Sequence, residues 1–213
     1  MTWVLLTYGD VGDVARVVRG YGFKPDVVPV EQLPSIGPPG RVYQLRFFVS
    51  WYKLYLLGLT DYDLLASIDL DMVCLGDMRD IYTMEHLSAP PDMGKDGDRI
   101  KMISDFATIT TAFAVFKPDR AWVRELEERA VEHLPAEGYW RLAEMSVLND
   151  WLAAGHRDVV HYLPEQWATH AMRVRQVKDI KLLHLPGAPK WWEDRRRART
   201  IGALVEGGVN GTD

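Results

Sequence analysis

The chain has 213 residues, of which 47 % are hydrophobic, and it carries a formal net charge of −5. This much apolar material can form a packed core, which argues against global disorder, and the net charge gives no overall attraction to nucleic acid or to an anionic membrane. No segment has the composition of a linker, so we predict a single domain.

The amino-terminal half alternates predicted strands and helices. Strands are predicted from Trp3 to Leu6 and from Asp26 to Val30, with a short helix around Val14 to Gly20 between them. A long buried helix is predicted over about residues 41–57, and the apolar run from Leu64 to Ile68 then indicates a buried strand. The lone cysteine, Cys74, excludes an intramolecular disulfide, and we expect it to be a small buried hydrophobe.

The remaining elements continue the same alternation, which predicts an α/β fold. In chain order they are a turn with a short helix (Met78–His86), a polar segment (Ser88–Asp105), a β-prone stretch (Thr108–Phe116), helices at Asp119–Leu134 and Glu144–Ala154, and strands at Val159–Leu163 and Ile180–Leu185. The polar segment is long for a connection, so we interpret it as a lid or a binding loop. We expect the Gly-rich residues 201–213 to be a flexible tail.

Two features of the sequence bear on location. The first ten residues lack a basic start and are too short an apolar stretch for a signal peptide, and no segment approaches the roughly 20 apolar residues of a membrane span. We therefore expect a cytoplasmic protein without a membrane span.

Two aspartates, Asp69 and Asp71, directly follow the apolar run. Because side chains alternate along a strand, both carboxylates should leave its end on one side. Ionised carboxylates that close repel each other unless a proton or a divalent cation lies between them, so the pair predicts a metal site or a strongly shifted acid. Other Asp-x-Asp pairs, at 61–63 and 96–98, lie in predicted turns or loops. For Asp69 and Asp71 as well, the alternative interpretation is a pair of surface acids on a turn.

A strand followed by Asp-x-Asp also begins the haloacid-dehalogenase type of phosphatase, where the first Asp is the nucleophile and the second the general acid. That motif normally continues to Thr, where this chain has Val73. It also opens its domain, whereas here a long α/β pattern precedes it. A phosphatase is therefore kept as an alternative.

Four separated segments of the chain match one family of enzymes, namely Trp3–Tyr8, Lys53, Ile68–Asp71 and His184–Trp192. They resemble the retaining glycosyltransferases of family 8, which have the GT-A fold and use a nucleotide sugar with manganese. The last is similar to the family's His-x-x-Gly-x-x-Lys-Pro-Trp signature, with Trp191 in place of Pro. The resemblance implies one Rossmann-like GT-A domain over residues 1–200, with a mostly parallel mixed central sheet flanked by helices.

The resemblance also implies roles for particular residues. Asp69, Asp71 and His184 would be the metal ligands, a mixed oxygen and imidazole set that suits Mn²⁺, with Mg²⁺ as the other choice. The residues that would contact the UDP-sugar donor are Thr7, Tyr8, Lys53, Thr110, Gly187 and Lys190. Lys190 would add a positive charge at the departing diphosphate, and Gly187 would let the backbone approach it closely.

Simpler interpretations stand beside these roles. His184 can be a core histidine at a strand end, Lys53 a lysine extending from a helix, and Thr7 with Tyr8 a plain turn.

The chain departs from the family at two positions. The family's sugar-binding Asn-x-Gly corresponds to Thr110–Ala112, and its Asp-Gln pair corresponds to Glu144 and Met145. Glu144 can still accept hydrogen bonds from sugar hydroxyls and is, with Lys190, the candidate catalytic residue, whereas Met145 supplies no polar group. A scaffold that binds the nucleotide sugar with little turnover is therefore a further alternative.

The sequence thus predicts a metal-dependent retaining hexosyltransferase that moves a sugar from a UDP-sugar to a hydroxyl group. The polar segment and the basic, aromatic stretch Trp191–Arg199 are candidates for the acceptor site. The acceptor would be a saccharide, a protein or a hydroxymethylated base in DNA, and the net negative charge argues against DNA.

Overall fold

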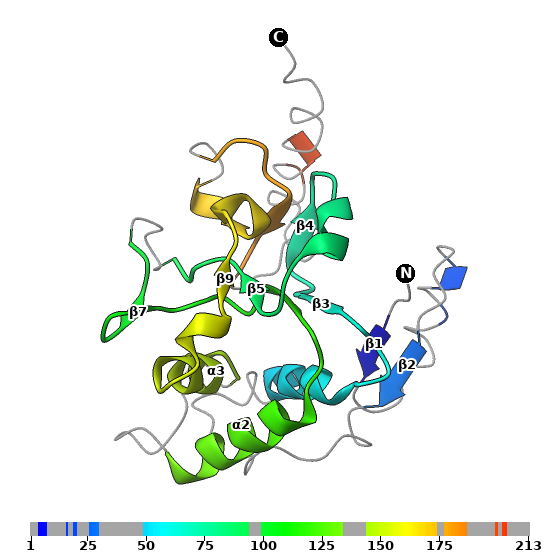
Figure 1. Ribbon diagram of the computed structural model, residues 1–213. Helices are drawn as coiled ribbons and strands as arrows, with labels where there is room; N and C mark the ends of the chain where they lie inside the picture. The colour runs from blue at the N-terminus through cyan, green and yellow to red at the C-terminus, as the bar shows by residue number, and fades with distance from the viewer. Residues whose placement is uncertain are drawn as a thin grey trace. The chain divides into compact units, whose positions relative to one another are not determined.

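The computed structural model describes residues 4–7, 16, 19–20, 26–29, 49–93, 99–133, 144–173, 177–186, 199 and 202–203 (Figure 1). The chain divides into two compact units, the first made of Met1–Thr60 with Asp119–Leu148 and the second of Asp61–Pro118 with Asn149–Asp213. The boundary between Leu148 and Asn149 falls inside helix α3 (Glu144–Ala153). The single domain over residues 1–200 stays a prediction.

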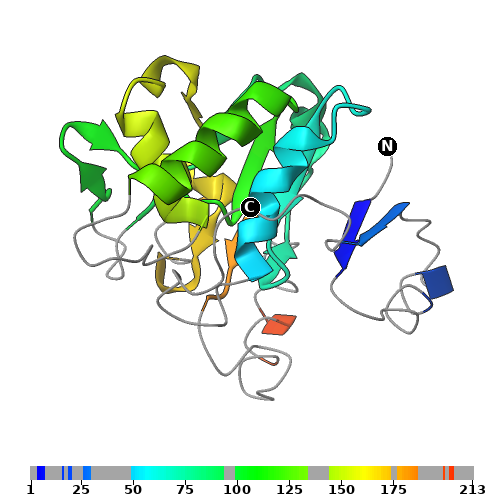
Figure 2. The same ribbon diagram turned by 90° about the horizontal axis from the view of Figure 1, so that it is seen from below.

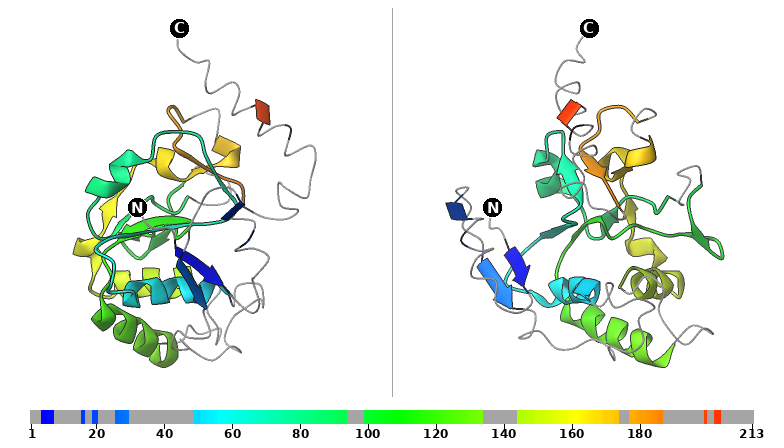
Figure 3. Two further views of the ribbon diagram at one scale, coloured as in Figure 1. Left: turned by 90° about the vertical axis from the view of Figure 1, so that its right-hand side faces the viewer. Right: turned by 180° about the vertical axis from the view of Figure 1, so that it is seen from behind.

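The first unit contains a strand pair and a helix pair. Strands β1 (Val4–Thr7) and β2 (Asp26–Pro29) are parallel, and Figure 3 shows them side by side. The 3-10 helix η4 (Val49–Gly58) packs against α2 (Arg120–Glu132), as Figure 2 shows. We call η4 and α2 the helix pair.

The sequence of α2 explains both its start and its packing. Asp119 caps the helix, because its Oδ1 accepts a hydrogen bond from the Ala121 N–H at 2.7 Å, which satisfies one of the otherwise unpaired donors of the first turn. Apolar residues at helical spacing form the buried face, on Val123, Leu126 and Ala130. On η4 the run Leu54–Leu57 is buried throughout, which confirms the predicted burial of this segment.

The second unit is built from short strands in separate sheets. One sheet has the order β3-β8-β5-β9, with β3 Leu65–Ile68, β8 Phe113–Phe116, β5 Ser88–Ala89 and β9 His161–Tyr162. Another has the order β10-β11-β4, with β10 Thr169–His170, β11 Leu182–His184 and β4 Met72–Cys74. A hairpin joins β6 (Met102–Ile103) to β7 (Phe106–Ala107). Short 3-10 helices complete the unit: η5 Arg79–Thr83, η6 Arg157–Val159, η7 Glu165–Trp167 and η8 Ala171–Arg173.

A hydrophobic cluster connects these two sheets. Phe113 of β8 stacks on Trp167, with ring centroids 5.2 Å apart and planes at 10°, and Val115 and Leu182 complete its buried part. Because Phe113 and Leu182 belong to different sheets, burying them together holds the sheets against each other. The chain crosses from one sheet to the other between β3 and β4.

Several predicted elements differ in detail from the observed ones. The described part of the predicted 41–57 helix is a 3-10 helix that begins at Val49. The predicted buried strand at 64–68 is buried only at Leu65, and Ile68 is 40 % exposed, because a layer covers one face of β3 only. Cys74 was predicted to be buried, but it is exposed on β4.

The prediction of a mostly parallel mixed sheet is confirmed as to the mixture: among the described strands, β1–β2, β10–β11 and β5–β9 are parallel, whereas β3–β8, β5–β8, β4–β11 and β6–β7 are antiparallel. In the larger sheet, β8 pairs antiparallel with both β3 and β5, and only β5 with β9 is parallel. Residues 69–112 separate β3 from β8, so tertiary packing sets this antiparallel pairing, and the local sequence pattern does not encode it.

Some predicted features lie mainly or wholly outside the described residues, namely the helix at 14–20, the stretch 191–199 and the tail 201–213. Within the described residues, none of the helices has the length and hydropathy that a membrane span requires.

Candidate metal centre

Asp69 and Asp71 lie on a tight turn, with Leu70 between them, which we call the Asp turn. The Met72 N–H donates to the Asp69 carbonyl at 3.1 Å, so the chain reverses within these residues, and Leu70 projects outward with 87 % of its surface exposed. We expected the carboxylates to converge because they alternate along one strand. That reason is wrong, since β3 ends at Ile68 and a turn brings the carboxylates together.

Main-chain hydrogen bonds anchor the Asp turn on both sides. The Asp69 N–H donates to the Ala112 carbonyl at 2.9 Å, which continues the β3–β8 ladder by one residue. The Leu185 N–H donates to the Asp71 carbonyl at 2.9 Å, which continues the β4–β11 ladder. Each aspartate is therefore fixed to a different sheet through its backbone.

Strand β11 brings His184 to the turn. It pairs antiparallel with β4 in a register that places His184 opposite Met72, the residue after Asp71. The His184 Nε2 lies 3.5 Å from the Asp71 Oδ1, and the two side chains are 18 % and 12 % exposed. One potential ligand atom from each of Asp69, Asp71 and His184 lies within 4.8 Å of the others. We call these three residues the metal cluster.

The donor set fits a divalent cation. Two carboxylates balance a double positive charge, and an imidazole nitrogen adds the donor type that manganese and similar metals accept. Ligands held at about 2.1 Å from an ion lie about 3–4 Å from one another, so the side chains need only small shifts to bind one. The partial exposure of the cluster leaves room for non-protein ligands.

Two residues that the sequence analysis missed lie close to the metal cluster. His170 of β10 is opposite His184 in the parallel register, with the rings edge to face and centroids 6.4 Å apart. Burial lowers the pKa of the His170 imidazole, and the charge of His184 acts in the same direction. No sequence motif marks this histidine, and only the pairing of β10 with β11 reveals it.

Asp92 is the second such residue, and it lies in the predicted polar loop. Burial raises the pKa of its carboxyl group, while a hydrogen bond from Lys101 and the charge of His184 oppose that effect. The Lys101 Nζ lies 2.7 Å from the Asp92 Oδ2. Part of this loop is ordered by main-chain bonds, since the Lys101 N–H donates to the Asp92 carbonyl at 2.9 Å.

Lys53 and Glu144 are brought together in the first unit. The Lys53 Nζ lies 3.4 Å from the Glu144 Oε1, with the side chains 24 % and 5 % exposed. The sequence predicts separate roles for Lys53 and Glu144 and does not predict their pairing. Opposite charges on two predicted helices were the available signal, but that pattern occurs too often to be specific.

The other predicted donor-site residues are described unevenly. Thr110 is partly buried, and its Oγ1 accepts a hydrogen bond from the Ala112 N–H at 3.2 Å. Thr7 is the last residue of β1, and its side chain is not among those described. Tyr8, Gly187 and Lys190 lie outside the described residues. Their predicted roles stay predictions.

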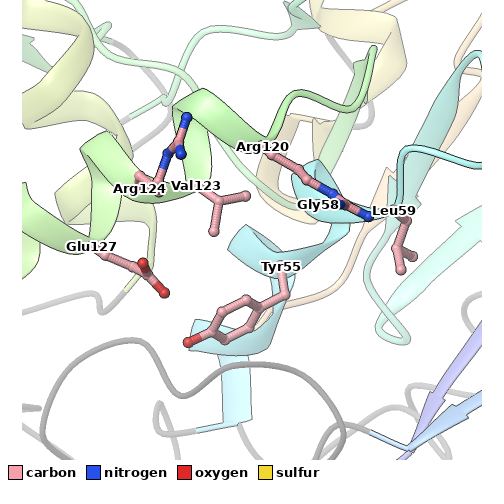
Figure 4. A pocket seen from close by; sticks show the side chains of 7 residues that line it. All are labelled: Tyr55, Gly58, Leu59, Arg120, Val123, Arg124 and Glu127. Atoms are coloured by element: carbon pink, nitrogen blue, oxygen red, sulfur yellow. The ribbon is translucent and has the colours of Figure 1, made fainter.

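A separate hollow of about 400 Å³ lies along the helix pair (Figure 4). Its lining residues are Tyr55, Gly58, Leu59, Arg120, Val123, Arg124 and Glu127. Figure 4 shows the Arg120 side chain extending toward Gly58. Of the predicted site residues whose side chains are described, none lines this hollow, so we assign it no part in the predicted chemistry.

Solved structures of glycosyltransferases share the fold. The galactosyltransferase LgtC, in complex with donor and acceptor sugar analogues, has a TM-score of 0.67 and 14 % identity, covering 100 % of this chain and 86 % of that chain. Mouse xyloside xylosyltransferase 1 has a TM-score of 0.55 and 10 % identity, with coverages of 87 % and 83 %. GlyE of Streptococcus pneumoniae has a TM-score of 0.61 and 12 % identity, with coverages of 96 % and 54 %. No family model and no curated protein matches the chain.

The chain therefore has the mixed α/β fold of these glycosyltransferases. At such low identities the likeness concerns the fold alone, and the chemistry has to be argued from the site.

Proposed function

We propose that this chain is a metal-dependent retaining glycosyltransferase of the family 8 type, which transfers a sugar from a UDP-sugar to an acceptor hydroxyl. The observation that carries the proposal is the metal cluster, in which Asp69, Asp71 and His184 gather from distant parts of the chain within 4.8 Å. The fold shared with glycosyltransferases supports it.

Asp69, Asp71 and His184 would hold Mn²⁺ or Mg²⁺. When bound, the cation acts as a Lewis acid that stabilises the negative charge appearing on the diphosphate as the bond between sugar and phosphate breaks. The Asp69 N–H donates to the Ala112 carbonyl and the Leu185 N–H donates to the Asp71 carbonyl. These hydrogen bonds hold the Asp turn before the donor arrives, so little reorganisation is needed when the charge on the diphosphate develops.

The remaining roles rest on residue type. Lys190 would add a point charge at the diphosphate, Gly187 would allow close approach of the backbone, and Thr7 with Tyr8 would contact the nucleotide. Thr110 would offer its hydroxyl to the sugar. No dedicated base is assigned, and the departing phosphate oxygen would take the acceptor proton during attack on the same face of the sugar.

For Glu144, the pairing with Lys53 adds a physical reason for its predicted catalytic role. The Lys53 ammonium group, 3.4 Å from the Glu144 Oε1, holds the buried carboxylate in place by an ion pair. An ionised carboxylate is a strong acceptor for sugar hydroxyls, so the pair would serve donor recognition.

The proposal extends to the finer predictions from sequence. These are one GT-A domain over residues 1–200 with a flexible tail, a cytoplasmic location, and an acceptor that is a saccharide, a protein hydroxyl or a hydroxymethylated base in DNA. The phosphatase alternative is less favoured, because a histidine from a distant strand joins the aspartates and the fold is that of glycosyltransferases.

The test is release of UDP from UDP-glucose, UDP-galactose and UDP-xylose in the presence of Mn²⁺. We expect release with at least one donor, and its loss in Asp71→Asn and in wild-type protein treated with EDTA. Asp77→Asn is the matched control, since Asp77 is an exposed acid of the same unit. Full release by Asp71→Asn without metal would contradict the proposal.

Two other outcomes separate the alternatives. Release of inorganic phosphate from a phosphomonoester, with no UDP release, would support the phosphatase. Binding of a UDP-sugar without release, with any of the acceptors supplied, would support the scaffold.

A further inference from the structure

A buried asparagine is hydrogen-bonded to the main chain of a segment that contacts the Asp turn. Asn149 lies on α3 and is 3 % exposed. Its Oδ1 accepts a hydrogen bond from the Ile109 N–H at 2.7 Å, and its Nδ2 donates to the Ile109 carbonyl at 2.9 Å. A side-chain amide offers both a donor and an acceptor, so it satisfies both main-chain groups of one residue, as a neighbouring strand would.

Ile109 is the first residue of a short segment, 109–112, whose last residue is hydrogen-bonded to the Asp turn. The Thr110 N–H donates to the Pro90 carbonyl at 3.0 Å, and the Ala112 N–H donates to the Thr110 Oγ1 at 3.2 Å. The Ala112 carbonyl then accepts the Asp69 N–H at 2.9 Å. The covalent chain of residues 109–112, hydrogen-bonded to Asn149 at one end and to the Asp69 N–H at the other, thus connects Asn149 to the backbone of Asp69.

Burial makes this connection stiff. Ile109 and Phe113 are 0 % exposed, Ala112 is 3 % exposed and Thr111 is 7 % exposed. Water cannot readily replace a lost partner in such surroundings, so an unsatisfied main-chain group would have to be relieved by movement of the segment. Movement of Ala112 would shift the carbonyl to which Asp69 is bound.

We propose that Asn149 is a positioning residue for the metal cluster. It does not touch the cation, and it acts through residues 109–112 by fixing the Ala112 carbonyl that holds Asp69. The proposal rests on the proposed function in one respect, namely that the cluster binds a divalent cation. In this account the side-chain amide of Asn149 partly sets the metal affinity of the cluster, although α3 contributes no ligand to the cluster.

The first test measures Mn²⁺ affinity by calorimetric titration of the full chain, expressed per folded molecule. Asn149→Leu keeps the branched shape and the number of side-chain heavy atoms and removes both hydrogen bonds, and we expect the affinity to fall about 10–100-fold, as for loss of other outer contacts that orient metal ligands. Asn149→Ser leaves room for a bridging water, so we expect a smaller loss in the same direction, and it serves as the second variant if Asn149→Leu folds poorly.

The control is Leu152→Ala on the same helix. Leu152 is 0 % exposed, so its truncation lowers stability through lost packing, while both hydrogen bonds between Asn149 and Ile109 keep their donor and acceptor groups. We expect its Mn²⁺ affinity per folded molecule to equal that of wild type. An equal loss of affinity in Leu152→Ala and in the Asn149 variants would overturn the proposal, because general loosening would then explain both.

The second test needs no metal. Hydrogen exchange of the Asp69 amide should become about tenfold faster in the Asn149 variants, the change expected when roughly one hydrogen bond weakens. The Leu185 amide, which is bound to the other side of the Asp turn, should exchange at the wild-type rate. Equal rates at Asp69 in variant and wild type would overturn the proposal.

The two failures can be told apart. A wild-type chain that binds no Mn²⁺ would contradict the proposed function and with it the link to metal affinity. A wild-type chain that binds Mn²⁺, with variants that bind it equally well, would contradict only the role of Asn149.

Discussion

The Asp turn of the second unit and the helix pair of the first are stabilised in opposite ways. The Asp turn depends on single main-chain bonds to strands that are remote in sequence, at Ala112 and Leu185. The helix pair depends on apolar side chains at regular spacing within each helix, such as Leu126 of α2 and Leu54 of η4.

This difference separates stability from function. Packing of apolar faces is tolerant of small shifts and contributes most of the free energy of folding. A cluster of like-charged carboxylates opposes folding until a cation is bound, and it has to be held by groups whose positions are sharply defined. We therefore expect substitutions in the helix pair to change stability and substitutions at the Asp turn to change metal affinity.

The largest expected effect on stability comes from Leu126→Ala, because Leu126 is 0 % exposed. Loss of its packing should cost about 2–5 kcal/mol of unfolding free energy. Urea denaturation measures the cost, and titration with Mn²⁺ under folding conditions should show an unchanged affinity per folded molecule. A large loss of affinity would remove the distinction between the two regions.

Asp69→Asn should have the opposite effects, namely weaker Mn²⁺ binding without a loss of stability. Removing one ionised ligand should weaken Mn²⁺ binding by about 100-fold or more, since even outer contacts contribute 10–100-fold. The melting temperature in EDTA should be equal to that of wild type or higher, because repulsion between the carboxylates is relieved. Calorimetry and thermal denaturation check the two parts, and wild-type affinity in the variant would exclude Asp69 as a ligand.

Lys53→Met tests the ion pair of the first unit. Glu144 is only 5 % exposed on its side chain, so loss of its cation partner should cost about 1–3 kcal/mol of unfolding free energy. The double variant with Glu144→Gln should recover part of that loss in a double-mutant cycle measured by urea denaturation. Strict additivity of the two single changes would show that the pair contributes nothing as a pair.

The smallest effect is expected at the start of α2. Asp119→Ala removes the cap on the Ala121 N–H and should cost about 1 kcal/mol of unfolding free energy, whereas Asp119→Ser should retain most of it. Urea denaturation of the three proteins measures the difference. An equal loss in both variants would mean that the carboxylate acts through something other than capping.

Local features of the fold could be predicted from sequence. Helix α2 was predicted at 119–134 and is observed at Arg120–Glu132, because the apolar spacing and the Asp119 cap are contained within the helix itself. A strand was predicted at 180–185, and β11 is observed at Leu182–His184. The 3-10 geometry of η4 was not predicted, since its apolar residues cover most of its surface and leave no periodic signal.

The metal cluster was predicted by resemblance, and its geometry was not. Asp69, Asp71 and His184 were named together, but the turn that joins the aspartates depends on hydrogen bonds to Ala112 and Leu185, which no local pattern encodes. The pairing of Lys53 with Glu144 and the nearness of His170 to His184 arise in the same way from tertiary packing.

The central claim is that one divalent cation binds between Asp69, Asp71 and His184. Anomalous diffraction from crystals soaked in Mn²⁺ and UDP tests it most directly. The account predicts one strong peak at about 2.0–2.3 Å from a carboxylate oxygen of each aspartate and from the imidazole of His184. A well-ordered turn with no peak between these side chains, or a peak held by other residues, would contradict it.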